Sequence, residues 1–432
     1  MHVDVVVVGA GPAGLAAATA AAASGATVTV VDESFRLGGQ YLRPRPPLPT
    51  RHPVVERFLA SGASVLLNRS VWHIDAQDRV VYADGDEIEY GALIIATGAY
   101  DRPHPVVGSE LRGVVTAGAA QALSKDGVRL GGRVLVAGHG PFALPVASEI
   151  IRSGGGLAEI ALARLPWMGS AAMYEPAVVG EAVGYGRQLA AHRVRVRVGW
   201  VVAEILGSDT VEAAVLVRAS GRRRGAQRVV RCDAVALGYG FLPQLALADI
   251  AGCELRFDEV QRTWFVDVDD ATLQTSVEGV FAAGEVVGIG GHRKALAEGA
   301  IAGRRAAAHA GRDTAPTEAE VRDLHRLRRF AYTARRALTP PPLAEAVPDE
   351  ALVCRCERVS AGEIRAAVRD GAVTVHGVRM RTRAGMGPCQ SRMCGQASVD
   401  LISAATNCPP DSCSRIAAHS PARPMTIGDL SA

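Results

Sequence analysis

The sequence has little lysine and few aromatic residues. Only Lys125 and Lys294 are lysines among 47 basic residues, so the positive charge lies almost entirely on arginine. No basic block stands out in a chain of formal net charge +3, and nucleic-acid binding is therefore not expected. Aromatic residues make up 5% of the chain, against 47 glycines, a balance that suits an α/β architecture with many tight turns.

The sequence also lacks an uninterrupted apolar run long enough to span a membrane. The N-terminal run contains Asp4, has no basic segment before it and is broken by Gly-Pro-Ala-Gly at 11–14. We therefore expect a buried strand and a helix there, no membrane span, and a cytoplasmic location. In such a compartment the eight cysteines point to metal or redox chemistry before disulfide bonds.

The first forty residues carry a strand, a glycine turn, a helix and a second strand that ends on two acids. Gly9 allows the tight turn, Gly11 lets a pyrophosphate approach the backbone, and Gly14 lets the helix pack close to the strand. The helix N-terminus offers free N–H groups to phosphates, and Asp32 can accept hydrogen bonds from a ribose. The pattern predicts a dinucleotide site rather than a ligand-free turn, formed by Gly9, Gly11, Pro12, Ala13, Gly14, Asp32, Glu33, Gly39 and Gln40.

A second glycine fingerprint lies further along the chain. A strand runs into Gly138 and Gly140, and the strand after the next helix ends at Arg164 with no acid. An NAD ribose normally finds a carboxylate at that position. Arg164 could instead take a 2′-phosphate, the site could hold ATP or another adenine nucleotide, or it could be empty.

Four cysteines near the C-terminus have the spacing of metal ligands. Cys354 and Cys356 form a C-x-C pair, and Cys389 and Cys394 form a C-x4-C pair further on. Four thiolates in a compact segment can bind a [2Fe–2S] cluster or zinc. Zinc sites usually pair C-x2-C knuckles, so the spacing favours the cluster, with zinc and free thiols as the alternatives.

The strand that ends in Ala96-Thr97-Gly98 resembles its counterpart in two-dinucleotide-domain flavoproteins of the glutathione-reductase and thioredoxin-reductase type. The resemblance implies an α/β fold with two Rossmann-like dinucleotide-binding domains and FAD in the first. In that class the strand returning to the first domain ends in Gly-Asp, whose acid bonds the ribityl chain; here Gly284-Glu285 stands in that place. The class thus implies FAD contacts from Ala96, Thr97, Gly98, Gly284, Glu285, Lys294 and Ala295.

The joined order of these motifs is similar to the α subunit of heteromeric bacterial amino-acid dehydrogenases. That family includes opine oxidases, proline and hydroxyproline dehydrogenases and hydrogen cyanide synthase. The cysteine segment resembles the small domain of bacterioferritin-associated ferredoxin. The resemblance implies an FAD-binding domain at 1–112 and 271–338, a second nucleotide-binding domain at 113–270, a Pro-rich linker at 339–350, and a small C-terminal [2Fe–2S] domain with a tail at 351–432.

The family also implies a division of labour between subunits. A β subunit of the D-amino-acid-oxidase type would oxidise the C–N bond of an amino acid, imino acid or opine to an imine. This chain would carry the electrons onward through FAD and the [2Fe–2S] cluster, so no residue in it is assigned a catalytic role. Further expectations are an FMN at a subunit interface and a small ferredoxin-like subunit.

Two other functions stay open from the sequence. A self-contained NAD(P)H-dependent FAD reductase, passing electrons to a ferredoxin or another acceptor, would need a nicotinamide site at the second fingerprint, and the missing acid argues against it. A non-catalytic nucleotide-binding scaffold is the other. Disulfide reduction is not expected, because no Cys-x-x-Cys follows the second fingerprint and no His-Glu pair lies near the end of the chain.

Overall fold

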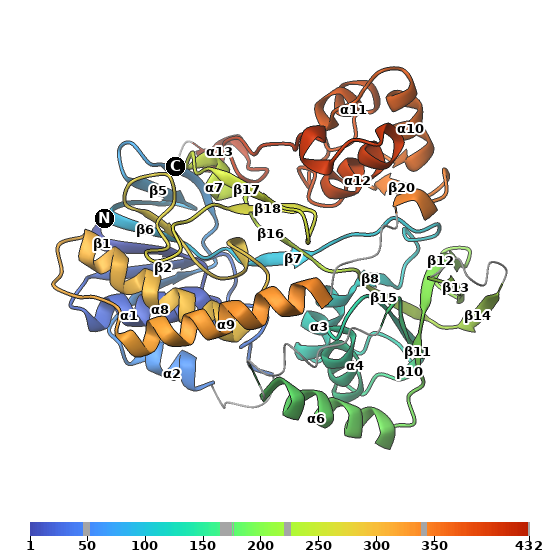
Figure 1. The fold of residues 1–432 in the computed structure, drawn as a ribbon, viewed down its shortest axis with the longest axis horizontal. Coiled ribbons are helices and arrows are strands. Elements are labelled where there is room, and N and C mark those ends of the chain that lie inside the picture. Colours follow the sequence, from blue (N-terminus) through green and yellow to red (C-terminus); the bar gives the residue numbers. More distant parts are fainter. Residues whose placement is uncertain (46–51, 165–174, 176, 220–225, 338–343, 431–432) are drawn as a thin grey trace.

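The computed structural model describes residues 1–45, 52–164, 175, 177–219, 226–337 and 344–430. These residues form two α/β domains and a smaller helical domain near the C-terminus (Figure 1). Of the proline-rich linker expected at 339–350, residues 339–343 lie outside the described part, and a short 3₁₀ turn, η3 (Ala344–Ala346), follows them.

The first domain is built on a sheet in the order β3-β2-β1-β6-β5-β4, with β19 beside β6. β1 pairs in parallel with β2 and β6, as expected for a strand whose residues Val5, Val6 and Val7 are fully buried. The strands are β1 (His2–Val8), β2 (Val28–Asp32), β3 (Ser64–Leu67), β4 (Val71–Asp75), β5 (Val80–Ala83), β6 (Asp86–Ile95) and β19 (Val280–Ala282).

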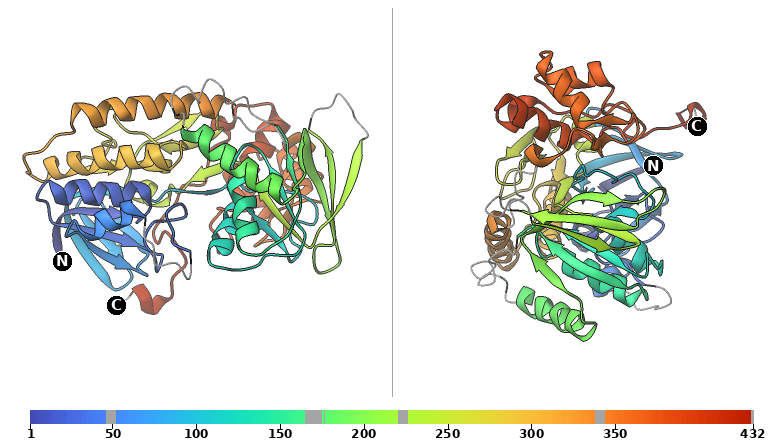
Figure 2. Two further views of the ribbon diagram at one scale, coloured as in Figure 1. Left: turned by 90° about the horizontal axis from the view of Figure 1, so that it is seen from below. Right: turned by 90° about the vertical axis from the view of Figure 1, so that its right-hand side faces the viewer.

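Helices cover one face of this sheet in two layers. α1 (Pro12–Ala23) and α8 (His292–His309) lie side by side under the sheet, and α9 (Glu318–Ala337) lies outside them (Figure 2). A Cβ on Gly299 of α8 would lie 2.1 Å from the carbonyl oxygen of Ala13, and one on Gly303 would lie 2.2 Å from that of Ala17. The helices can approach this closely because their contact is made of glycine and alanine. A short helix, α2 (Pro53–Leu59), packs against α1.

The opposite face of the first sheet is covered by residues that lie beyond the second fingerprint. Helix α7 (Ala246–Ile250) and the hairpin of β17 (Leu255–Asp258) and β18 (Thr263–Val266) share a buried core with β1, β4, β5 and β6. The sequence assigned 113–270 to the second domain. The packing instead places the segment from about residue 246 on the first domain, because Leu247, Ala248 and Val266 bury their side chains there.

The second domain has a parallel sheet in the order β11-β10-β9-β15-β8. Helices α3 (Ala117–Lys125), α4 (Ala143–Arg152) and α6 (Ala177–Ala191) lie on one side, and an antiparallel sheet of β12 (Trp200–Leu206), β13 (Ala213–Arg218) and β14 (Gln227–Arg231) packs on the other. The parallel strands are β8 (Val114–Thr116), β9 (Val134–Gly138), β10 (Leu157–Leu162), β11 (Val196–Val198) and β15 (Ala234–Gly238).

Two antiparallel strands, β7 (Ala99–Asp101) and β16 (Phe241–Pro243), carry the chain between the two α/β domains. The small domain sits above them in Figure 1 and has its own apolar core. It consists of β20 (Leu352–Cys354), β21 (Val359–Ser360), α10 (Ala361–Arg369), α11 (Val375–Thr382), α12 (Gly395–Thr406) and the 3₁₀ turn η4 (Pro410–Cys413). The capping box of Ser360 and Glu363 expected at the start of α10 is present.

The C-terminal tail leaves the small domain and runs back over the first domain to α13 (Ile427–Leu430), near β5 (Figure 1). Asp249 of α7 accepts two hydrogen bonds from the guanidinium of Arg415 and one from the amide of Ala418. The amide of Ala422 donates to the carbonyl of Trp72 at 2.8 Å, and Ala422 is buried in the same core as α7. The tail therefore belongs in part to the first domain.

Candidate functional site

The first glycine fingerprint forms a turn that only glycine allows at two of its three positions. Gly9 has φ +108°, and a Cβ on it would lie 2.4 Å from the carbonyl oxygen of Ala96. A Cβ on Gly14 would lie 1.7 Å from the carbonyl oxygen of Gly9. By contrast, a Cβ on Gly11 would meet nothing within 4 Å. Gly11 therefore borders open space at the N-terminus of α1, where Pro12 stands in the first turn, and this arrangement suits a pyrophosphate.

The two acids at the end of β2 have different surroundings. Asp32 accepts hydrogen bonds from the amide of Ala10 at 2.5 Å and from the amide of Ser34 at 2.7 Å. Burial raises the pKa of Asp32, although these hydrogen bonds act in the opposite direction. Glu33 is exposed. Asp32 thus holds the fingerprint turn in place, while the neighbouring carboxylate of Glu33 is open to solvent.

The Gly-Gly-Gln loop crosses the fingerprint. The amide of Gly38 donates to the carbonyl of Ala10, and a Cβ on Gly39 would lie 2.9 Å from Cα of Gly11. The sequence predicted that Gly39 and Gln40 lie near the cofactor, and the structure places Gly39 beside Gly11. The side chain of Gln40 is exposed, and its carbonyl is engaged by the second domain.

The Ala96-Thr97-Gly98 turn lies next to the same glycines and is tied to the chain that returns from the second domain. The amide of Ala96 donates to the carbonyl of Val8, while the hydroxyl of Thr97 donates to the carbonyl of Gln244 at 2.8 Å. A Cβ on Gly98, whose φ is +73°, would meet nothing within 4 Å. Because β1 and β6 are parallel neighbours, Gly11 and Gly98 are two open points of backbone at the carboxyl edge of the same sheet.

The returning strand brings Gly284 onto α1. Gly284 has φ +89°, and a Cβ on it would lie 2.8 Å from Cβ of Ala13. Oε1 of Glu285 accepts hydrogen bonds from the amides of Gly290 at 3.2 Å and Gly291 at 2.8 Å. Burial raises the pKa of Glu285, and the Lys294 ammonium partly offsets this. The carboxylate thus binds the two N–H groups immediately ahead of α8.

Lys294 is buried rather than directed at open space. Its ammonium donates to the carbonyls of Gly284 at 3.3 Å and Gly288 at 2.9 Å, and to Oε2 of Glu298 at 2.7 Å. Oε2 of Glu298 also accepts from the amide of Gly284. Ala295, the next residue, is buried in the core against α1. These contacts show that Lys294 holds the Gly284–Gly288 loop in place, whereas the sequence predicted that Lys294 contacts the cofactor.

The second fingerprint lies on the second domain and repeats part of the first. A Cβ on Gly138 would lie 1.9 Å from the carbonyl oxygen of Gly238, and Gly140 has φ +86°. Arg164, at the end of β10, is exposed. The residues at 165–174 lie outside the described part of the chain. The structure therefore shows the tight turn that Gly138 allows but leaves the ligand of this site open.

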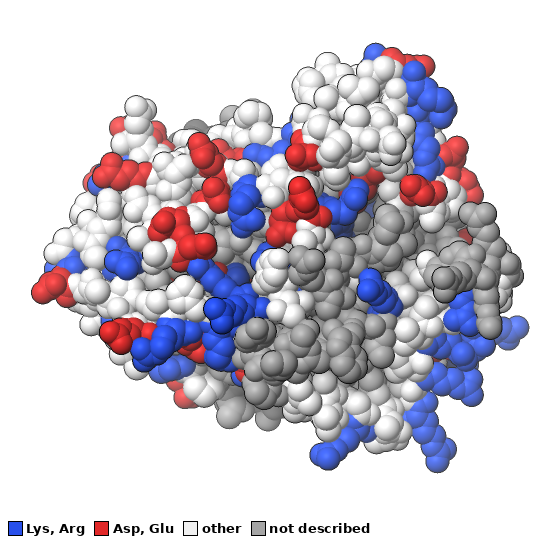
Figure 3. Space-filling view, viewed as in Figure 1, with Lys and Arg blue, Asp and Glu red and all other residues white. Residues whose placement is uncertain are grey.

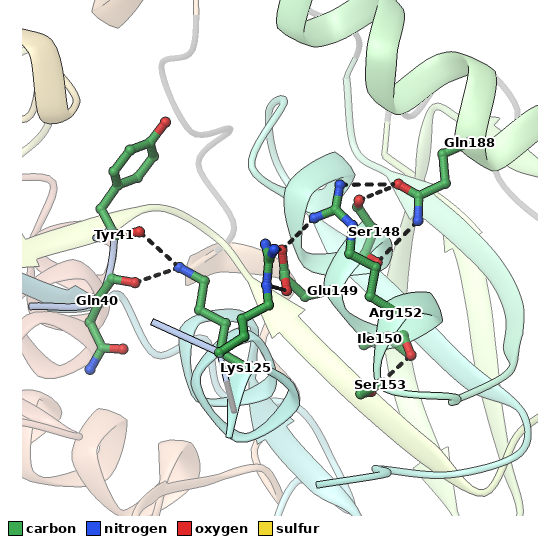
Figure 4. Close-up of polar contacts among 10 residues, drawn as sticks. Gln40, Tyr41, Lys125, Ser148, Glu149, Ile150, Arg152, Ser153 and Gln188 are labelled. Carbon is green, nitrogen blue, oxygen red and sulfur yellow. Dashed lines mark hydrogen bonds and ion pairs between the residues drawn. The ribbon is translucent and has the colours of Figure 1, made fainter. Parts of the chain in front are cut away.

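A cluster of charged residues joins the two α/β domains close to the Gly-Gly-Gln loop (Figure 4). The ammonium of Lys125, on α3, donates to the carbonyls of Gln40 at 2.6 Å and Tyr41 at 3.1 Å. Burial lowers the pKa of Lys125 to about 8, while nearby Glu149 acts to raise it. Glu149 is bound by Arg45 from the first domain and by Arg152 at 2.6 Å from its own helix. The cluster fixes how the second domain meets the loop.

One feature of the sequence could have pointed to this cluster. Lys125 is one of only two lysines in the chain, and both are buried. A lone lysine among arginines marks a site that needs a compact ammonium rather than a planar guanidinium. The partners of Lys125 are main-chain carbonyls, which no motif reveals.

The four C-terminal cysteines come together as two pairs. Cys394 lies near Cys354, and Cys389 lies near Cys356, so that the neighbouring thiol affects the pKa of Cys394 and of Cys389. Burial raises the pKa of both Cys394 and Cys389, and the neighbouring thiols raise it further. Within the described residues, no three His, Cys, Asp or Glu side chains converge closely enough to hold one ion. Two pairs of thiols fit a two-iron cluster, in which each iron takes two thiolates.

The cysteine pairs lie beside the strand that follows the Ala-Thr-Gly turn. Tyr100 of β7 is close enough to Cys389 and Cys394 to sense their charge, and burial raises its pKa to about 12. Arg102 donates to Oδ2 of Asp400, on α12, at 2.7 Å. Arg355 donates to the carbonyl of Ser109 at 2.6 Å. The small domain is therefore attached to the crossover segment, and Tyr100, which the sequence did not single out, lies between the turn and the thiols.

Comparison with protein families agrees with both halves of this arrangement. Residues 3–311 match the model of the pyridine nucleotide-disulphide oxidoreductases, and residues 352–404 match that of the BFD-like [2Fe-2S] binding domain. The chain belongs to the pyridine nucleotide-disulphide oxidoreductase family. Within this family it carries the BFD-like domain at its C-terminal side, which confirms the expected α/β fold with two dinucleotide-binding domains and a small iron–sulfur domain.

Relatives of this oxidoreductase match along almost its entire length. It is 31% identical to an opine oxidase subunit of Agrobacterium tumefaciens, over 99% of this chain and 91% of the relative. It is 30% identical to hydrogen cyanide synthase subunit HcnB of Pseudomonas aeruginosa, over 94% of each chain. The predicted resemblance to this group of subunits is thereby confirmed, and the chain is a flavoprotein oxidoreductase of that type.

The fold of this oxidoreductase is shared with solved structures. L-proline dehydrogenase from P. horikoshii superposes with a TM-score of 0.74 and 21% identity, covering 100% of this chain and 79% of that one. Thioredoxin reductase from T. acidophilum superposes on 71% of this chain with a TM-score of 0.54 and 21% identity. Among the described residues, no helix is both long and apolar enough to cross a membrane.

Proposed function

We propose that this chain is the flavin and iron–sulfur electron-transfer subunit of a heteromeric amino-acid or imino-acid dehydrogenase. The observation that carries the proposal is that one chain, which matches an opine oxidase subunit over 99% of its length, combines a glycine fingerprint open at Gly11 with two pairs of thiols beside the crossover strand. FAD accepts electrons in pairs and a [2Fe–2S] cluster passes them singly, so the two groups together connect a two-electron donor to a one-electron acceptor.

FAD would lie along the carboxyl edge of the first sheet, in a groove beside Gly11 and Gly98. Its pyrophosphate would occupy the open space at Gly11 against the N-terminus of α1, with Pro12 and Ala13 in the first turn. The exposed carboxylate of Glu33 is better placed to accept hydrogen bonds from the ribose hydroxyls, because Asp32 already accepts two amides. The remaining contacts would come from residues that border the groove: Gly9, Gly14, Gly39, Gln40, Ala96, Thr97, Gly98 and Gly284.

Glu285 would act on the flavin through the loop that it holds. Its carboxylate accepts the amides of Gly290 and Gly291, and Lys294 fixes the other end of the same loop through the carbonyls of Gly284 and Gly288. We infer that these two side chains, with Ala295 packed behind them, set the position of the α8 N-terminus relative to the cofactor. A direct contact of Glu285 with the ribityl chain would require its carboxylate to leave the two amides.

The [2Fe–2S] cluster would be held by Cys354 and Cys394 on one iron and by Cys356 and Cys389 on the other. The proximity of Cys354 to Cys394 and of Cys356 to Cys389 supports this assignment. Thiols with raised pKa values must lose their protons when metal binds, so cluster assembly would release protons. Tyr100, between the Ala-Thr-Gly turn and the cysteines, would fill the gap between the two groups and exclude water from it.

Oxidation of the substrate itself would take place on a partner. We propose a β subunit of the D-amino-acid-oxidase type that oxidises proline, hydroxyproline or an opine to the imine. Further proposed components are an FMN at the interface and a small ferredoxin-like subunit. The second fingerprint, at Gly138 and Gly140, would hold ATP or another adenine nucleotide, because Arg164 rather than an acid ends β10.

Anaerobic spectroscopy of the purified chain tests the proposal. NADH, NADPH, proline, hydroxyproline and an opine are added in turn, with and without the β subunit, while flavin and cluster absorption are followed. We expect reduction only when an amino acid and the β subunit are both present. Rapid bleaching of the flavin by NADH or NADPH alone would overturn the proposal in favour of a self-contained reductase. Adenine nucleotide without any flavin would favour a scaffold.

A further inference from the structure

The two pairs of cysteines differ in their exposure. Cys354 and Cys394 are each 1% exposed, whereas Cys356 is exposed and Cys389 is half-buried. Gly387 leaves room beside Cys356, because a Cβ there would lie 2.1 Å from that of the cysteine. The group of four cysteines therefore has a buried inner edge, formed by Cys354 and Cys394, and a more exposed outer edge, formed by Cys356 and Cys389.

The segment that carries the four cysteines is rich in arginine. Between residues 352 and 394 the acids are Glu357, Glu363 and Asp370, whereas arginines occupy eight positions: Arg355, Arg358, Arg365, Arg369, Arg379, Arg381, Arg383 and Arg392. Glu357, the acid next to Cys356, is bound by Arg383 at 2.8 Å, so its charge is neutralised. That contact also brings the end of α11 against the Cys356 loop. We call the exposed side chains of Arg358, Met380, Arg381 and Arg383 the outer rim.

The outer rim combines charge with an apolar contact. Arg358, Arg381 and Arg383 are exposed, and Met380, between the α11 arginines, is 64% exposed. A flexible methionine side chain flanked by positively charged arginines is suited to brief association with a negatively charged surface. The crossover segment already contacts the small domain through Arg102, which binds Asp400, and through Ser109, whose carbonyl accepts from Arg355. The outer rim takes no part in these two contacts, so another molecule can approach the cluster there.

We propose that the outer rim is the docking surface for an acidic one-electron carrier protein. This inference depends on the proposed [2Fe–2S] cluster and extends the proposed function to the electron acceptor. In each encounter the reduced cluster loses one electron to the carrier's oxidised centre, and no bond forms or breaks. Two encounters remove the pair of electrons that one substrate molecule supplies. Charge complementarity favours an acidic partner, because the three exposed arginines face one neutralised acid.

The experiment uses the full-length holoprotein and needs no amino-acid substrate. A pre-reduced plant-type [2Fe–2S] ferredoxin, an acidic low-potential carrier, is mixed with the oxidised protein by stopped flow, and cluster reduction is followed across a range of ionic strength. Cytochrome c, a basic carrier, is mixed with the dithionite-reduced protein as the probe of opposite charge. We expect fast, strongly salt-dependent reduction by the ferredoxin and slow, salt-insensitive transfer to cytochrome c.

Variants locate the surface. R358E with R381E should slow reduction by the ferredoxin at least tenfold at low salt, whereas R358Q with R381Q should have an intermediate effect. R369E is the matched control, since Arg369 is also an exposed arginine in the last turn of a helix but lies at the end of α10 away from the Cys356 loop. R231E makes the same change on β14 of the second domain. Cluster absorption should be unchanged in all four proteins.

The outcomes separate the docking surface from the proposed function. The outer rim would be overturned as the docking surface if R369E or R231E slowed reduction by the ferredoxin as much as R358E/R381E does. It would also be overturned if the rate of reduction changed neither with salt nor in R358E/R381E. Both outcomes would leave the cluster in place. Faster transfer to cytochrome c than from the ferredoxin would overturn the choice of an acidic partner. A protein without iron–sulfur absorption would overturn the proposed function itself, and the docking surface with it.

Discussion

At the scale of single residues, both lysines of the chain donate hydrogen bonds to main-chain carbonyls instead of lying at the surface. Lys125 binds the carbonyls of Gln40 and Tyr41, and Lys294 binds those of Gly284 and Gly288. An ammonium can direct three donors at carbonyls that lie around one point, which the planar guanidinium fork of arginine cannot do. The positive charge at the surface is therefore carried by arginine. The arginines gather over the second domain at the lower right of Figure 3 and alternate with acids over the first domain.

A substitution at Gly11 should change FAD binding without changing the stability of the fold. A Cβ at Gly11 would meet nothing within 4 Å, so Gly11→Val should fold, but its side chain would fill the space expected for the pyrophosphate. We expect loss of FAD from the purified variant, with the unfolding free energy of the flavin-free protein changed by less than about 1 kcal/mol. Flavin content and urea unfolding measure the two quantities. Full retention of FAD would contradict the assignment of the groove.

His104 gives the crossover a pH dependence. Burial lowers its pKa to about 4, and Arg102 adds to this, whereas an unfolded histidine has a pKa of about 6.5. Between pH 4 and pH 6.5, His104 binds a proton in the unfolded chain but not in the folded chain, so the free energy of unfolding falls as the pH falls. From pH 7 to 5.5 this group should account for a loss of about 1 kcal/mol, which should be absent in His104→Gln.

Urea unfolding of the wild type and of His104→Gln at the two pH values measures the difference. The control is His376→Gln, which removes an exposed histidine from α11 and should keep the wild-type dependence on pH. A variant at position 104 with the same pH dependence as the wild type would mean that His104 titrates in the folded protein.

At the scale of elements, the small domain is tied to the first domain by a tail as well as by the crossover. Asp249 of α7, whose side chain is 7% exposed, accepts from Arg415 and from the amide of Ala418. Gln390 and Arg392, in the cysteine loop, donate to the carbonyls of Pro421 and Ala422. The tail therefore contacts both the cysteine loop and the first sheet, and it should limit movement of one against the other.

Asp249→Ala should release the tail. The variant leaves Arg415 without its carboxylate and Ala418 without an acceptor, at a cost of about 1–3 kcal/mol. We expect faster amide hydrogen exchange over residues 415–423 with unchanged exchange in α8. Asp270→Ala, which removes a 94% exposed partner of Arg328, is the control and should change neither segment. Unchanged exchange in the Asp249 variant would mean that the other contacts of the tail, among them Ala422 with Trp72 and Arg392 with Ala422, hold it without Asp249.

The elements of the first domain were largely predictable from the sequence, because strands buried on both faces and glycine turns are local patterns. The side chains of Glu285 and Lys294 were not. The sequence placed both at the cofactor, whereas the structure turns Glu285 to the amides of Gly290 and Gly291 and Lys294 to carbonyls and Glu298. Whether a polar side chain faces a ligand or the backbone depends on tertiary neighbours that spacing does not encode.

At the scale of the whole molecule, the small domain has its own core but shares contacts with the crossover and the tail. Cys356→Ser removes the exposed cysteine of the proposed cluster site. We expect the variant to lose its iron–sulfur absorption and keep stoichiometric FAD, because Gly11 and Gly98, at the proposed FAD site, lie on the other domain. Visible spectroscopy with iron and flavin analysis measures this. Loss of both groups would show that the two domains fold as one unit.

By itself the sequence determined the fold class, the two glycine fingerprints, the four cysteines and the family, because each depends on residue types at short, fixed spacing. Only the tertiary structure decided where the second domain ends, since Leu247 and Val266 bury themselves against strands nearly two hundred residues away. It also decided that Lys125 and Arg45 join the two α/β domains. It brought Cys354 close to Cys394, and it returned the tail over β4 and β5. These contacts link distant segments, and their energy comes from burial and charge pairing that exist only after the chain has folded.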